Sequence, residues 1–467
     1  MRRNPERPCL AGVFAVFLAA SAGLFGQPAA PPSTLTLAQA VESALRNYPS
    51  IRVSQEQVGA AAAGIQLART AYLPRVDGLA QVNRATRNNV FGLLLPQSVI
   101  PSMSGPVLGT NNFGSAFGST VGVLVTWEPF DFGLRRGNVA AADAARAQLE
   151  ASLKRTQFEV AATTADAYLT LAAAQETVRA AQAGVDRADV VLGTIHALVD
   201  AQLRPGADAS RAEAELAAAR TQLIQAQQAT DIARATLSQF VGMEPARIVV
   251  SAPGLLQLPP ERAVMPLDTA SNPIAVEQDA AVEQAKGQLR ALERSYFPHF
   301  NLQASAYARG TGAETNGELL GGLNGLAPSV QNYALGFSVT FPVLDLPAIR
   351  AREAVQSATI RAQMARSQLI ATNLRAEFNR AAASLDGARR IAANTPVQVS
   401  AARAAEQQAT ARYQAGLGTI AEVADAQRLL TQSEIDDALA RLSVWRGLLG
   451  VATAAGDIQP FVVEASR

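Results

Sequence analysis

The sequence predicts a mostly helical protein of two homologous halves that also carries a few strands of a membrane β-barrel. Three observations predict this fold class. Apolar residues recur at alternating steps of three and four over very long stretches, short segments alternate strictly between apolar and polar residues, and an ordered set of unlike motifs occurs twice. The formal net charge of +1 over 467 residues argues against a nucleic-acid partner, because polyanion binding needs a basic excess.

The composition favours close helix packing over catalysis. Hydrophobic residues make up 49% of the chain but aromatic residues only 5%, and alanine fills the gap at about a fifth. Small side chains of this kind suit long helices in close contact. One cysteine, Cys9, and two histidines, His196 and His299, exclude a disulfide framework and a Cys/His zinc site. We therefore expect no enzyme, no cofactor and no bound metal.

The N-terminus predicts export. Arg2, Arg3 and Arg7 precede an apolar run over residues 10–20, and the small residues 20–22 follow it. This order is typical of a secretory signal peptide, expected over residues 1–26 with cleavage between 22 and 30. A buried helix or a membrane anchor is the alternative, but the run is shorter than the ~20 residues of a membrane span. Cys9 precedes the run, where no lipobox would place it, so no lipid anchor is expected.

The rest of the chain contains no candidate transmembrane helix. After the signal peptide, no segment approaches ~18 consecutive apolar residues. An exported chain of this kind is either soluble or enters a membrane as a β-barrel.

The repeat defines the domain organisation. Asp131 with Arg136 reappears as Asp345 with Arg350, 214 residues later, and three further motifs recur in the same order. Each half is expected to run helix, strand, loop, strand, long helix, tip, helix. The predicted units are a first repeat, an equatorial linker, a second repeat and a C-terminal tail, at residues 35–250, 251–272, 273–455 and 456–467.

The helices follow a coiled-coil spacing. Between residues 140 and 203 no proline interrupts the pattern, although Gly184 and Gly193 weaken it. At 1.5 Å per residue this stretch is roughly 95 Å long, too long for a compact domain. In the second half, Pro396 is expected to kink the long helix or to end its regular hydrogen bonding.

The strands follow the other period. Apolar Leu335, Phe337 and Val339 alternate with small or polar residues. In residues 301–308, leucine or alanine stands at every even position and alternates with Asn, Gln, Ser or Tyr. This pattern fits either a lipid-facing barrel or a soluble half-buried hairpin. Aromatic residues at the strand ends favour the barrel, because such residues form interfacial girdles. The expected girdle comprises Tyr72, Trp127, Phe130, Phe132, Tyr296, Phe297, Phe300 and Phe341.

Four strands cannot close a membrane barrel, since the smallest need about eight. Open sheet edges in lipid leave backbone groups unsatisfied at several kcal/mol each. If the strands enter a membrane, several chains must share one barrel, although this reasoning does not give their number.

Several segments resemble the TolC family of outer-membrane efflux proteins. The start of the mature chain at residues 35–49, Tyr72-Leu73-Pro74, and residues 127–133 and 413–427 are similar to family motifs. The resemblance covers about residues 35–455. It implies a trimer in which each chain gives four strands to one outer-membrane β-barrel and long helices to one periplasmic α-barrel.

The resemblance also implies the function and the partners. The chain would be a passive exit duct for small molecules, localised in the outer membrane with a periplasmic extension. A periplasmic adaptor would connect it to an inner-membrane pump. A component of type I protein secretion is the near alternative. A periplasmic adaptor or a structural coiled-coil protein is less favoured, because neither explains strands repeated in both halves.

The resemblance further implies two kinds of site at the tips. Gly206 and Gly416 match the glycines at which the family docks its adaptor, and Gly418 lies beside the second. Glycine permits close backbone approach, although ordinary helix ending explains these residues equally well. His196, one turn before the first tip, is expected on a polar face, and His299 at the membrane interface.

The periplasmic gate is the second implied site. Glu422 and Asp425 share a helix face and would form carboxylate rings about a threefold axis, unless they are only a solvated face. Tyr413 matches a family latch residue with Asp208 as its acceptor. The family's basic latch residue is replaced by Gly418, which predicts a weaker closed state.

Overall fold

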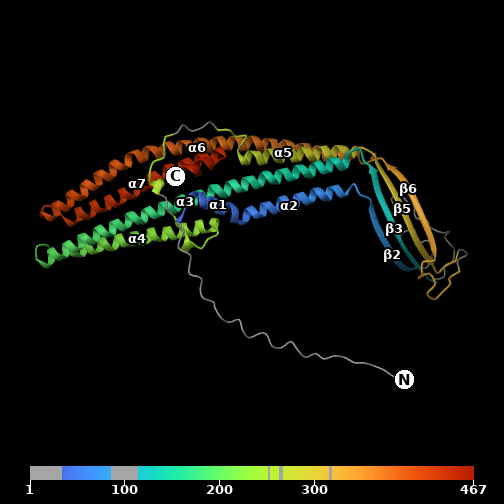
Figure 1. Ribbon diagram of the computed structural model, residues 1–467, viewed down its shortest axis with the longest axis horizontal. Coiled ribbons are helices and arrows are strands. Elements are labelled where there is room, and N and C mark those ends of the chain that lie inside the picture. The colour runs from blue at the N-terminus through green and yellow to red at the C-terminus, as the bar shows by residue number, and fades with distance from the viewer. Residues whose placement is uncertain (1–33, 86–113, 251–252, 262–266, 315–317, 467) are drawn as a thin grey trace, which may run out of the picture.

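The computed structural model describes residues 34–85, 114–250, 253–261, 267–314 and 318–466. Long helices form the body, a curved sheet stands at one end, and two helical hairpins point to the other end (Figure 1). The expected signal peptide and most of the long loop at residues 83–119 lie outside the described residues.

Both halves have the predicted order of elements. The first half comprises α1 (Leu37–Asn47), α2 (Pro49–Thr70), β2 (Arg75–Ala85), β3 (Ala116–Phe130), α3 (Leu134–Asp200) and α4 (Gly206–Val241). The second half comprises α5 (Pro273–Leu292), β5 (His299–Thr311), β6 (Val330–Thr340), α6 (Leu346–Gln414) and α7 (Ile420–Ala455). The prediction of two homologous halves is confirmed.

Local sequence sets the first helix boundaries. Thr36 caps α1 in a capping box. Its side chain accepts a hydrogen bond from the backbone N–H of Gln39, and the side chain of Gln39 accepts one from the backbone N–H of Thr36. Pro49 stands at the first position of α2, where its missing N–H costs nothing. Tyr48, just before the proline, is extended and ends α1.

A central core joins the two ends of the described chain at the middle of the helical body. The short strand β1 (Thr34–Leu35) pairs in parallel with β4 (Val249–Val250). Tyr168 is buried beneath it and its hydroxyl donates to the Leu35 carbonyl at 3.1 Å. Burial raises the pKa of Tyr168 to about 12.

The segments expected to be an equatorial linker and a C-terminal tail both contribute to this core. In the equatorial linker, a short 3₁₀ helix at Pro253–Leu256 buries Leu255. Trp445 of α7 donates its indole N–H to the Gln257 carbonyl at 3.0 Å. The expected C-terminal tail forms α8 (Gln459–Ala465), which buries Phe461. Both segments are therefore anchored to the helical body.

The sheet is antiparallel, with strand order β2-β3-β5-β6. The register places Val125 opposite Val76 and Ala304, and Ala304 opposite Leu335, on one face of the sheet. Large apolar side chains on this face are exposed; they include Val76, Val121, Val123, Tyr333, Leu335 and Phe337. The other face buries Leu124 and two polar residues, Gln303 and Ser305. An exposed apolar face and a covered polar face are the reverse of a soluble half-buried sheet.

The helices next to the sheet follow the same order as the strands. α2 contacts α3, α3 contacts α5, and α5 contacts α6. Each helix continues the strand beside it in sequence, so helices and strands form one continuous layer (Figure 1). Among the described residues this layer has two open edges, α2 with β2 and α6 with β6. Toward the tips, α4 packs on α3, and α7 packs between α3 and α6.

Small residues set the spacing between helices, as the composition predicts. A Cβ added at Gly447 would lie 2.9 Å from the Cα of Leu385 on α6, and one at Gly184 would lie 3.0 Å from Thr431 Oγ1 on α7. Within the described ranges, no helix has an apolar stretch of the length that a membrane crossing requires.

The long helices differ in detail from the prediction. α3 covers Leu134–Asp200, six residues earlier at its start than the expected 140–203. α6 contains Pro396 and continues through it as one helix of 69 residues, so Pro396 does not end the helix. Figure 1 shows α6 bending gradually toward the tips.

Candidate functional sites: the two tips and the sheet

The two tips share one backbone turn. In the first tip the Gln202 N–H donates to the Val199 carbonyl at 2.9 Å, and in the second the Gly416 N–H donates to the Tyr413 carbonyl at 3.0 Å. Gln202 and Gly416 are 214 residues apart, the same offset as the repeated motifs. The tips are therefore equivalent positions of the two halves.

This equivalence identifies the residue of the first tip that corresponds to Gly416. Gly416 has φ +76° and Gln202 has φ +60°, so both take the left-handed conformation that favours glycine. Gly206, which was expected to be an adaptor-docking glycine, is the first residue of α4. The tip-glycine position of the first half is thus occupied by glutamine. The 214-residue offset applied to Gly416 would have identified it.

A small separate core holds the two hairpins together near the tips. Its buried members come from all four long helices: Ile195, Ala212, Tyr413, Ile420 and Val423. Tyr413 is only 3% exposed. The tips of one chain therefore behave as a single packed unit.

Polar contacts reinforce this core around Tyr413. Its hydroxyl donates to Asp208 Oδ2 at 3.1 Å, as the expected latch requires. Burial, and then the hydrogen bond to Asp208, raise the pKa of Tyr413. Arg204 places its guanidinium 4.4 Å from the centre of the Tyr413 ring and donates Nη2–H to the Tyr413 carbonyl at 2.5 Å.

Sequence reasoning missed Arg204. It stands 214 residues before Gly418 and so occupies the equivalent position of the first tip. The basic side chain absent at Gly418 is present in the other half. A Cβ at Gly418 would lie 3.1 Å from Glu422 Oε2 and 3.3 Å from the Tyr413 backbone nitrogen, so the carboxylate of Glu422 folds over this glycine.

The two gate acids have different surroundings. Both are exposed on the first turns of α7. Thr419 caps this helix by accepting from the Glu422 backbone N–H at 3.4 Å. Asp425 pairs with Arg428 of the same helix, and Arg428 also approaches Glu215 Oε2 on α4 at 3.9 Å. Among the described residues Glu422 has no ion pair, so its charge is the less compensated of the two.

The expected girdle residues gather where the strands meet the helices. Phe130 contacts Phe132 at 4.7 Å between ring centres, and Phe132 stacks on Phe297 at 5.2 Å. The Trp127 indole donates to the Tyr72 carbonyl at 3.1 Å. The grouping at this end of the sheet is as expected, and its place at a membrane interface stays a prediction.

A buried ion pair fixes the start of α3 at the same junction. Asp131 Oδ2 accepts from the Arg135 backbone at 2.6 Å and from its Nε at 2.9 Å, and Oδ1 accepts from the Gly133 N–H at 3.1 Å. Arg135 Nη1–H also donates to the Ala71 carbonyl at the end of α2 at 3.1 Å. The repeated motif pointed to Arg136, but the buried partner is Arg135, which the repeat does not share.

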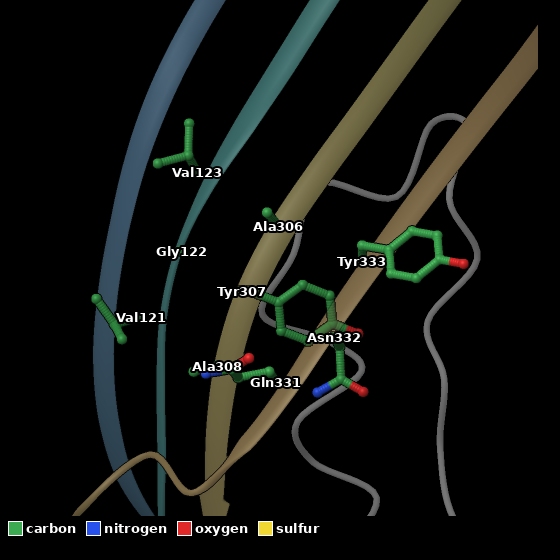
Figure 2. Close-up of a pocket in the computed structure, with 9 residues that line it drawn as sticks. All are labelled: Val121, Gly122, Val123, Ala306, Tyr307, Ala308, Gln331, Asn332 and Tyr333. Atoms are coloured by element: carbon green, nitrogen blue, oxygen red, sulfur yellow. The ribbon is translucent and has the colours of Figure 1, made fainter.

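A shallow groove of about 690 Å³ crosses three strands of the sheet. Val121 and Val123 project from β3 on the side away from the Tyr307 ring of β5 (Figure 2). A Cβ at Gly122 would collide with Tyr307 Cβ, so glycine is required opposite this tyrosine. The groove is lined by Val121, Gly122, Val123, Ala306, Tyr307, Ala308, Gln331, Asn332 and Tyr333.

The histidines form isolated pairs. His299 Nδ1 lies 2.7 Å from Glu128 Oε1 at the end of the sheet, and His196 Nε2 lies 3.4 Å from Glu213 Oε1 near the first tip. The described part of the chain holds no cluster of histidine and acidic side chains that could bind a metal ion.

The open-edged layer of strands and helices, with its apolar sheet face outward, defines the fold of a channel-forming outer-membrane protein. The sequence matches the family described as "Outer membrane efflux protein" over residues 40–243 and 269–457. The chain therefore belongs to this family.

One sequence relative and two solved structures are similar to this chain. The outer membrane efflux protein BepC of Brucella suis is 28% identical over 331 residues, which are 68% of this chain and 64% of BepC. The CmeC outer membrane channel of Campylobacter jejuni has a TM-score of 0.71 at 15% identity, covering 95% of this chain and 94% of CmeC. The MtrE channel of Neisseria gonorrhoeae, solved in an open state, has a TM-score of 0.67 at 20% identity, covering 90% and 89%.

Proposed function

We propose that three copies of this chain form an outer-membrane exit duct for small molecules, fed by an inner-membrane pump. The observation that carries this proposal is the sheet, which exposes large apolar side chains such as Tyr333 and Leu335 on one face and covers polar ones on the other. A lipid-facing wall with a water-filled interior needs this arrangement.

The open edges support assembly. Within the part of the chain that the structure describes, β2 and β6 each leave one edge of the sheet unpaired. In lipid such edges would leave backbone groups unsatisfied at several kcal/mol each. Three chains of four strands would pair every edge, with β6 of each chain beside β2 of the next, and would exceed the minimum of about eight strands.

The tips are the proposed docking points for a periplasmic adaptor. Leu203 and Leu417 follow the left-handed residues of the two tips and are 70% and 73% exposed. Because these two leucines hold equivalent positions in the two halves, a trimer would present six similar exposed leucine side chains. Gly416 is exposed and leaves the second tip's backbone accessible, whereas Gln202 adds a side chain to the first. The adaptor would therefore meet two kinds of tip.

The acids near the second tip are proposed to form the periplasmic gate. In a trimer, Glu422 and Asp425 would recur three times around the axis and attract cations. Because Arg428 compensates Asp425, Glu422 should dominate the field. Tyr413, Asp208 and Arg204 would hold the two hairpins of each chain together at this entrance.

Single-channel conductance in planar bilayers tests the duct and its gate. The purified protein should conduct with cation preference, and a trivalent cation added on the periplasmic side should block the current. Glu422→Ala should weaken selectivity and block more than Asp425→Ala, and both variants keep a good helix former. Glu244→Ala, an exposed acid far from the tips, is the control. No conductance at all would contradict the duct. Unchanged cation selectivity and unchanged block in a variant that combines Glu422→Ala with Asp425→Ala would contradict the gate.

A further inference from the structure

The two edge helices each expose a matching stripe. On α2, Val53 is 56% exposed and Leu67 72%. On α6, Val355 is 68% exposed and Leu369 58%. Both stripes face away from the neighbouring helix of the same chain, because the buried residues of these segments lie on the opposite sides: Ile51, Ser54 and Ile65 on α2, and Ile360 and Leu374 on α6.

Contacts across the layer give the relative height of these stripes. Ser54 of α2 bonds Thr156 of α3 at 3.2 Å, Arg155 of α3 bonds Glu277 of α5 at 2.8 Å, and Ser367 of α6 bonds Asp279 of α5 at 2.8 Å. Ser54 on one edge of the layer therefore stands at nearly the same height as Ser367 on the other edge.

A second set of contacts, nearer the sheet, gives the same alignment. Arg135 of α3 bonds the carbonyl of Ala71, which follows α2, and two residues later Gly137 packs against Ala291 of α5. Tyr296, just after α5, donates to Glu353 of α6 at 2.6 Å. Ala71 is thus level with the segment around Glu353.

Cyclic symmetry turns these heights into a register between chains. For helices that run parallel to the ring axis, these levels are heights along that axis, and a rotation about the axis leaves them unchanged in every copy. We infer that α2 of one protomer packs antiparallel against α6 of the next with Glu56 beside Arg366 of the partner subunit. In this register the residue numbers of facing positions add to 422.

The register matches residue types along the central stripe of the contact. Apolar residues face apolar residues, as Val53 faces Leu369 of the partner subunit and Leu67 faces the partner's Val355. Small residues also face small residues, as Ala60 faces the partner's Ala362 and Gly64 the partner's Ala358. A Cβ at Gly64 would meet nothing within 4 Å in its own chain.

The charges select this register over its neighbours. Glu56 and Arg366 are exposed and form no ion pair within the described part of their own chain. Sliding the helices by one turn in either direction places Glu56 opposite Ile370 or Ala362 of the partner subunit. Arg366 would then face Ala60, or the like-charged and exposed Arg52. Only the proposed register joins the two free charges.

This inference rests on the proposed trimer but not on what the duct transports. Cysteine cross-linking tests it directly, because Cys9 is the chain's single cysteine and the mature chain has none. Ala60→Cys with Ala362→Cys should give a covalent trimer on a denaturing gel after mild oxidation. Ala60→Cys with Ala376→Cys is the matched control, since residue 376 shares the stripe but lies about 21 Å further along α6. This control should stay monomeric.

The outcomes separate the register from the assembly. A trimer on a native gel that is not cross-linked by the 60/362 pair, or is cross-linked equally by the control, would overturn this register and leave the duct standing. Absence of any trimer would overturn both.

A charge exchange provides an independent test. Glu56→Arg and Arg366→Glu should each lower the temperature at which the trimer dissociates in detergent, and the double variant should restore it. A double variant no more stable than the single ones would contradict the pair.

Discussion

The contact between α6 and α7 predicts the effect of adding one methyl group at Gly447. A Cβ there would lie 2.9 Å from Leu385 Cα and 3.1 Å from Leu385 Cβ and Cδ1. The nearest atom belongs to the backbone, so a rotamer change cannot relieve the contact. Gly447→Ala would therefore force the two helices apart.

The magnitude follows from two opposing effects. Replacing glycine by alanine within a helix stabilises by about 1 kcal/mol on intrinsic propensity. Overpacking a closely packed contact costs about 1–3 kcal/mol. Gly447→Ala should thus be neutral to about 2 kcal/mol destabilising. Gly193→Ala is the control, because a Cβ at this exposed position of α3 meets nothing within 4 Å, and it should stabilise by about 1 kcal/mol.

Hydrogen exchange of the α6 and α7 backbone amides measures the difference. The two variants should differ by about 1–3 kcal/mol, or roughly 5- to 150-fold in protection of the α6–α7 amides. Equal stabilisation by both substitutions would refute the argument that Gly447 sets the distance between α6 and α7.

Two further substitutions test the junction and the tips. Asp131→Asn should destabilise the protein by about 3 kcal/mol or more, because Arg135 would be left buried without its charged partner. Denaturant unfolding of the detergent-solubilised protein measures this loss. The control is Asp77→Asn, which breaks an exposed ion pair of the sheet and should cost less than about 1 kcal/mol. Both tip positions have positive φ, so Gly416→Ala should cost about 1 kcal/mol in local stability, whereas Gln202→Gly should cost nothing or stabilise. Hydrogen exchange of the tip amides measures both changes. Changes in local stability of the same sign for the two variants would contradict the prediction.

The fold class could be predicted because its signals are periodic and repeated. The seam of α3 shows this, since Leu171, Ala181 and Ile195 stand at coiled-coil spacing and are all nearly inaccessible. The alternation in β6 likewise identified which residues point outward. Element ends were less accurate, because the start of α3 depends on the Asp131–Arg135 ion pair and not on periodicity.

The sites were predicted less completely, because their geometry depends on contacts between the halves. Tyr413 and Asp208 are 205 residues apart and meet only because four helices converge at the tips. Arg204 was missed because no local sequence pattern marks an arginine that packs on a tyrosine of the other hairpin. Gln202 was missed because no residue type in the sequence marks a glutamine whose backbone adopts the left-handed conformation.

Labelling of cysteines at two adjacent positions of β6 tests the central claim most directly. Phe337 lies on the exposed apolar face and Ser338 on the polar face. If the sheet forms the wall of an outer-membrane duct, a water-soluble thiol reagent should label Ser338→Cys in intact membranes. Phe337→Cys should react only after detergent replaces the lipid. Equally fast labelling of Phe337→Cys in membranes would contradict the account, because that face would then be in water.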